Sequence, residues 1–170
     1  GYVDGTLWDK DSIGEYSTAL GYSSQAKGYA SFTAGYYTSA IGDYGVAMGQ
    51  YSSARGSNSV AIGNLATARG SNAIALGYFT TASGDYSMVM GRSTTSAGSM
   101  STAMGYNNIS RGDYSTVMGI GNISRAYCSL VLGQYNDTTP SVSLFSWLAA
   151  DPVFVIGNGT ANSLRSNALT

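Results

Sequence analysis

Apolar and polar positions alternate along most of this chain in a pattern tied to small residues at every multiple of seven. Between Gly14 and Gly133 these small residues are all glycine except Ala126. The residues between them alternate in character, as expected of strands whose successive side chains point to opposite faces. Helix is disfavoured, because glycine every seven residues would cost about 1 kcal/mol each relative to alanine. We therefore expect strands of about five residues that are separated by glycine turns.

Two kinds of seven-residue unit alternate, so the true repeat is fourteen residues. Units after even multiples of seven include GDYGVAM and GSNSVAI, and units after odd multiples include GQYSSAR and GNLATAR. In both kinds the third and fifth residues after glycine are small, for example Ser59 and Ala61. These positions are expected to face a thin interior between the two strands of one coil. The pattern predicts an all-β β-solenoid of fourteen-residue coils.

The glycines of the series are expected to make the tight reversals, where a positive φ is free only to them. Ala126 should then be the one place where the turn tolerates a Cβ atom, and its φ should be negative. Nine such coils, stacked at the spacing of neighbouring strands, would form a rod roughly 40 Å long.

The fourth and sixth residues after glycine form the outer face and distinguish the two kinds of unit. This face is mostly polar in the odd units and apolar in the even units. An apolar stripe of this length does not stay exposed on a soluble monomer, so we predict a homo-oligomer built around it. A cyclic trimer is a natural solution for a narrow roll, although the period itself does not distinguish a trimer from a dimer. The predicted axis residues are Val46, Met48, Val60, Ile62, Ile74, Leu76, Met88, Met90, Met104, Met118, Leu130 and Leu132.

The repeat also divides the chain into three segments. Residues 1–13 have no clear period and are predicted to be an N-terminal cap, because the open edge of a solenoid must be covered. Residues 14–139 form the predicted roll. Residues 140–170 carry more aromatic and aliphatic bulk than the coils and are predicted to be a C-terminal cap or neck.

Composition narrows the functional classes. The 170 residues carry a formal net charge of −1 and only 10% of them are charged, which argues against a nucleic-acid binder. Histidine, the commonest general base and metal ligand, is absent. No apolar run is long enough to span a membrane, and Cys128 has no partner for an internal disulfide. We predict no catalytic residues, no metal site and no cofactor.

The acidic residues recur at one position of the repeat. Glu15, Asp43, Asp85 and Asp113 each follow an even glycine. Such residues are more typical of turns, where a carboxylate accepts backbone N–H groups, than of a catalytic pair. Contact with a carbohydrate or a cation is the alternative.

The N-glycosylation sequons of the chain, including the one at Asn108, are relevant only if a eukaryote makes the chain.

The candidate ligand surface combines exposed tyrosines with residues of the polar face. Tyrosines either cover the edges of the roll or act as contact residues with a large area and a polar tip. The hydroxyl ladder of the polar face either consists of solvent-facing strand formers or binds ice, and the arginines beside it argue against ice binding. The residues predicted for this surface are Tyr37, Tyr51, Arg55, Arg69, Thr67 and Thr81.

Two stretches, GSNSVAIGNLATARGSNAIALG at 56–77 and GDYSTVMG at 112–119, resemble the head repeats of trimeric autotransporter adhesins, the YadA-like family. The resemblance covers residues 12 to about 139. It implies a left-handed parallel β-roll that trimerises with the SVAIG-type strands inside, at a bacterial surface. The C-terminal segment is similar instead to segments that follow such repeats in proteins of Bacteroidota and in phage fibres, ahead of an intramolecular chaperone domain.

Together these features predict a non-enzymatic trimeric adhesin head, on the bacterial cell surface or secreted. Its expected partners are two further copies of itself and an extracellular matrix protein, cell-surface or glycan ligand. The alternative is a structural shaft or spacer of a phage tail fibre or extracellular filament, in which no surface binds. A glycan hydrolase with carboxylates between subunits is a third class, opposed by the scarcity of acids.

Overall fold

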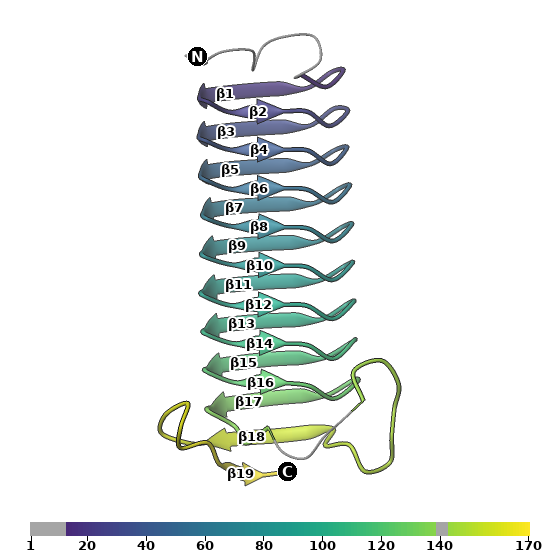
Figure 1. Cartoon of the computed structure of the whole chain (residues 1–170), viewed down its shortest axis with the longest axis vertical. Coiled ribbons are helices and arrows are strands. Elements are labelled where there is room, and N and C mark those ends of the chain that lie inside the picture. The colour runs from purple at the N-terminus through teal and green to yellow at the C-terminus, as the bar shows by residue number, and fades with distance from the viewer. Residues whose placement is uncertain (1–12, 139–142) are drawn as a thin grey trace.

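A long and a short strand alternate along the chain, and each pair forms one coil of a solenoid (Figure 1). This computed structural model describes residues 13–138 and 143–170. The long strands are β1 (Thr18–Tyr22), β3 (Phe32–Tyr36), β5 (Val46–Gln50), β7 (Val60–Asn64), β9 (Ile74–Tyr78), β11 (Met88–Arg92), β13 (Thr102–Tyr106), β15 (Thr116–Ile120) and β17 (Leu130–Gln134). The short strands are β2 (Gln25–Ala26), β4 (Ser39–Ala40), β6 (Ser53–Ala54), β8 (Thr67–Ala68), β10 (Thr81–Ala82), β12 (Thr95–Ser96), β14 (Ile109–Ser110) and β16 (Ile123–Ser124).

The two kinds of strand form two separate parallel sheets. The long strands pair in chain order from β1 to β17, and the short strands pair from β2 to β16. Each residue pairs with the residue fourteen positions further, as Val60 does with Ile74 and Thr67 with Thr81. The prediction of an all-β solenoid with fourteen-residue coils is therefore confirmed. Eight coils contain both strands, and the ninth has only its long strand among the described residues.

The prediction of two five-residue strands per coil is wrong for the short strands. Units after even glycines form strands of five residues, whereas units after odd glycines form strands of two. The long strand is extended because it continues through the next odd glycine to the residue beyond it. In β7, for example, the strand passes through Gly63 to Asn64.

The expectation that the glycines supply the positive φ of the reversals is also wrong. The odd glycines have φ between 94° and 143°, but all of them lie inside or next to the pairing of the long strands. The even glycines have no positive φ, and Ala126, as predicted, has none either. They are required by close approach instead, because a Cβ atom on Gly70 would lie 2.0 Å from the carbonyl oxygen of Gly84.

The left-handed conformation of each reversal falls two residues after a multiple of seven. Among the described residues, seventeen that are not glycine adopt it, with φ between 42° and 59°, and Tyr44, Leu65 and Phe79 are examples. None of the seventeen is β-branched, although valine, isoleucine and threonine are common elsewhere in the coils. β-Branched residues tolerate the left-handed region least. Their absence from this position of the repeat is therefore a signal in the sequence that could have located the reversals.

The interior holds small side chains, as predicted. A continuous cluster of buried residues consists almost entirely of alanine and runs from Ala40 to Val89. Buried polar side chains reach carbonyl groups of the odd glycines: the Ser52 hydroxyl donates to Gly63 O at 2.9 Å, and Asn108 Nδ2 donates to Gly119 O at 2.7 Å. The side chain of Asn108 is thus buried in the interior, so the sequon at this position is not accessible for glycosylation.

Beyond β17 the chain leaves the repeat and then rejoins it. Strand β18 (Phe154–Asn158) pairs in parallel with β17, and β19 (Asn167–Leu169) pairs antiparallel with β18. A loop from residue 143 to 150 lies beside the reversals of the last coils, where the Asp113 amide donates to Leu144 O at 2.9 Å (Figure 1). The predicted N-terminal cap lies outside the described residues except for its last position. The division into three segments, the left hand and the trimer remain predictions.

Candidate functional site

The outer face of the long strands is a continuous apolar stripe. All twelve predicted axis residues project from this face, where they alternate with buried interior residues such as Ala61. Neighbouring coils stack them in register, as Ile62 stacks with Leu76 and Leu76 with Met90. In the single chain these side chains are half-buried or exposed, with 37% of Ile62 and 40% of Met90 accessible. The structure gathers the stripe on one face, and its role as a trimer axis remains a prediction.

The outer face of the short strands carries the predicted polar residues. Thr67 and Thr81 are registered neighbours on β8 and β10, and both are half-buried. Arg55 and Arg69 follow directly after β6 and β8 and are exposed. Arg55 Nε donates to the hydroxyl of Ser53 at 3.2 Å, which holds its side chain along the sheet. Four of the six residues predicted for ligand contact therefore share this face.

The tyrosines of the candidate surface lie elsewhere, at the edge where the long strands end. Tyr37 and Tyr51 stack with their ring centroids 5.5 Å apart, and Tyr22 and Tyr36 stack beside them at 5.2 Å. Partial removal from water, with smaller contributions from the neighbouring Tyr51 and Tyr37, raises the pKa of the Tyr36 phenol above its usual value. The predicted ligand surface is therefore two surfaces, one at this edge and one on the short strands.

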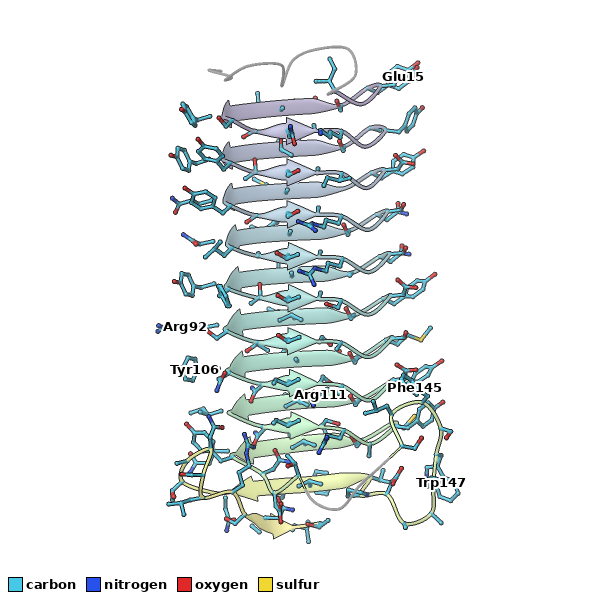
Figure 2. All side chains as sticks on the ribbon, viewed as in Figure 1. Glu15, Arg92, Tyr106, Arg111, Phe145 and Trp147 are labelled. Carbon is cyan, nitrogen blue, oxygen red and sulfur yellow. The ribbon has the colours of Figure 1, made fainter. Side chains whose placement is uncertain are left out.

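A cation between two rings was missed by the sequence analysis. Arg92 lies 5.6 Å from the ring centroids of both Tyr78 and Tyr106, and Figure 2 shows Arg92 and Tyr106 at the same edge as the tyrosine stacks. The three residues are spaced fourteen apart, so the period placed them in one column. Only the stacking of coils shows that the guanidinium is sandwiched between aromatic faces, an arrangement that stabilises the charge.

The recurring aspartates act as turn residues, as predicted. The Oδ1 atoms of Asp43, Asp85 and Asp113 each accept a backbone N–H from the preceding coil, at 2.8 to 2.9 Å. The donor is always the residue fourteen positions earlier, for example Ser71 for Asp85. The same edge carries Glu15, which Figure 2 shows on the side opposite Tyr106. The carboxylates of the three aspartates therefore tie one coil to the next.

Two other kinds of feature are absent from the described residues. Over residues 13–138 and 143–170, no three side chains of histidine, cysteine, aspartate or glutamate lie close enough to share a metal ion. That same part of the chain has no helix with the length and hydrophobicity needed to cross a membrane.

Comparison with known proteins identifies the repeat. Residues 12–44, 40–66, 68–94 and 96–122 each match the model of the YadA head domain repeat, which spans two copies of the unit. These matches extend from the residues just before β1 to the loop before β16, so they include most of both outer faces. No curated protein sequence matches the chain significantly.

Proposed function

The chain belongs to the YadA head family, and on this premise we propose that it is the non-enzymatic head of a trimeric surface adhesin. Adhesins of this family are exposed at the surface of the cell, form trimers and are generally non-enzymatic. In the proposed assembly, three chains pack their long-strand faces around one axis and turn their short-strand faces outward. The head would act at a bacterial cell surface or as part of a secreted fibre.

The distribution of side-chain size carries this proposal. The interior is filled with alanine, serine and other small residues, whereas the large aliphatic residues Ile62, Leu76 and Met90 lie on the outer face. An isolated chain would leave these large aliphatic side chains exposed to water, whereas such side chains are usually buried. Packing this face against two further copies supplies the core that the thin interior lacks.

The proposed binding mechanism is multivalent. Each rod repeats similar outer residues from coil to coil, and a trimer presents three such rods. Weak contacts to a matrix protein or a glycan then add up, because each contact after the first forms at a high effective concentration.

The oligomeric state tests the axis. We expect sedimentation equilibrium to give three times the chain mass of 17.6 kDa for the native sequence. Ile62→Asp should dissociate or unfold this assembly, because it buries a charge without a partner at the axis. Ser83→Asp, which adds the same charge on the exposed short-strand side, should remain trimeric. A stable native monomer, or an Ile62→Asp variant that stays assembled and folded, would contradict the proposal.

Binding assays separate an adhesin from a shaft or spacer. The trimer, coupled to beads, is expected to adhere to immobilised matrix proteins or glycans more strongly than Ile62→Asp chains coupled at the same density. Adhesion that does not exceed that of uncoated beads on any of these surfaces would favour the spacer.

A further inference from the structure

Five of the eight lysines and arginines lie in one straight column on the outer face of the short strands. Each follows directly after a short strand and is exposed to solvent. The ladder between coils continues through them: Arg55 N donates to Ala68 O at 2.7 Å, and Arg111 N donates to Ser124 O at 2.9 Å. The column consists of Lys27, Arg55, Arg69, Arg111 and Arg125.

Over β2 to β16 no acidic residue lies on this face; the first one on its continuation is Asp137, which lies fourteen residues after Ile123 and lines the same cavity as Arg125. The outward positions of β2 to β16 and the residues just after them hold only cationic, hydroxyl, amide, alanine and isoleucine side chains. The nearest recurring acids, such as Asp43 and Asp85, lie at the reversals and bind backbone amides there. Figure 2 shows Arg111 over the short strands, whereas Glu15 projects at the edge. Positive charge is therefore segregated on a face although the whole chain is nearly neutral.

Within the column the cations form two pairs on adjacent coils. Arg55 neighbours Arg69 and Arg111 neighbours Arg125, each pair being about 5 Å apart along the axis. Like charges at neighbouring registered positions destabilise a sheet. Over the described residues, none of the four has an ion-pair partner. No ion pair within the described residues offsets this repulsion, whereas an anion bound between two guanidinium groups would relieve it.

We propose that this column binds a linear sulfated polysaccharide that lies along the axis of the rod. This inference rests on the proposed adhesin function and names a ligand class for it. The two arginine pairs are separated by three coils, about 14 Å, and the column from Lys27 to Arg125 spans seven, about 34 Å. Planar guanidinium groups match tetrahedral oxyanions in a bidentate fashion, so each pair suits a sulfate group.

The residues between the pairs favour a sugar chain over a nucleic acid. They include the threonines of β10 and β12, Thr81 and Thr95, whose hydroxyls can bond to sugar hydroxyls. The outer face of the short strands carries no aromatic ring on which bases could stack.

Immobilised heparin, a sulfated polysaccharide, is the probe. We expect the native trimer to bind it with an affinity that falls as salt rises, and to bind unsulfated hyaluronan much more weakly. Arg69→Gln should weaken heparin binding about fivefold, because it removes one charge-assisted contact per chain. Arg92→Gln is the matched control: it removes the same charge at the tyrosine edge, and binding should change less than twofold. Circular dichroism and sedimentation should show that both variants remain folded trimers.

Three results would overturn the proposal. The first is failure of the native trimer to bind heparin, and the second is an equal loss with Arg92→Gln and Arg69→Gln. The third is binding of duplex DNA as tight as that of heparin and equally sensitive to Arg69→Gln, which would make the face a general polyanion surface. If beads still adhere to matrix proteins in any of these cases, the adhesin function stands and only this ligand class fails.

Discussion

At the scale of single residues, the reversals show how a stacked fold sustains unfavourable backbone conformations. A non-glycine residue in the left-handed region costs on the order of 1 kcal/mol, and the coils contain seventeen of them. This cost is offset because the backbone amide of each such residue donates to a carbonyl group of the preceding coil. Tyr44 N donates to Tyr29 O at 2.7 Å, and Leu65 N donates to Gln50 O at 2.9 Å. The ladder between coils thus continues around the corner, where an ordinary turn would leave these amides to water.

The even glycines give a prediction about close approach. Gly70→Ala should destabilise the fold by about 3 kcal/mol or more, because the new Cβ atom would lie 2.0 Å from Gly84 O and both groups belong to the backbone. The free energy of unfolding in urea measures this change.

Gly45→Ser is the control for this substitution. A Cβ atom on Gly45 would lie 2.8 Å from Gly42 O, but the equivalent positions in other coils hold serine, including Ser59 and Ser87, so a small local shift should accommodate it at a cost of less than about 1 kcal/mol. Equal losses for the two substitutions would show that close approach at the even glycines is not the determining constraint.

At the scale of elements, buried polar side chains differ between the middle and the last coils. In the last coils Asn108, Asn122 and Asn136 form a ladder in which each amide bonds to its neighbours: Asn122 N donates to Asn108 Oδ1 at 2.8 Å, and Asn136 N donates to Asn122 Oδ1 at 3.1 Å. In the middle coils some buried hydroxyls, such as those of Thr80 and Ser87, have no partner in the described structure. The turn before the short strand is therefore held by fewer side-chain hydrogen bonds at Thr80 than at Asn108 or Asn122.

Removing one rung of the asparagine ladder tests this difference. Asn122→Ala leaves the carbonyl groups of Met118 and Gly133 and the amide of Asn136 without their partner, and it should cost about 2 to 4 kcal/mol. Thr80→Ala occupies the same repeat position but removes a hydroxyl that has no partner, so its effect should stay within about 1 kcal/mol. Chemical denaturation of both variants checks the prediction, and a reversed order would contradict it.

At the scale of the whole molecule, each coil contacts mainly its neighbours, so the rod is a one-dimensional stack. The interior of one chain buries little apolar surface per residue, because its buried hydrophobic residues are alanines with a few valines. The missing burial lies on the outer face of the long strands. Stability and assembly are therefore expected to be coupled.

This coupling predicts that the melting temperature depends on protein concentration. If folding requires association, raising the chain concentration a hundredfold should raise the Tm by several degrees, because mass action favours the assembled state. Scanning calorimetry over that range measures the shift. A Tm that does not change with concentration, for a protein that refolds reversibly, would mean that the single rod is stable alone.

The period, the strands, the buried positions and the apolar stripe could all be predicted from the sequence. These follow from local rules: side chains alternate along a strand, and a residue such as Ala61 or Ile62 reveals its face by its size and polarity. Family resemblance reached the same fold from the SVAIG-type units. The role of the aspartates was also predictable, because it depends on one residue type at one place in the turn.

The atoms that meet between coils could not be predicted in this way, because they depend on how the coils stack. In the folded chain the left-handed conformation at the reversals belongs to Leu65 and its equivalents and not to the glycines. This position depends on backbone hydrogen bonds to the preceding coil, made to a residue fifteen positions earlier. The fold also places Tyr37 and Arg69 on different surfaces. It stacks the cations of the short-strand face in one column without ion-pair partners, a local charge that the net charge of the chain does not indicate. Stacking converts a repeat along the sequence into columns in space, and those columns carry the surface chemistry.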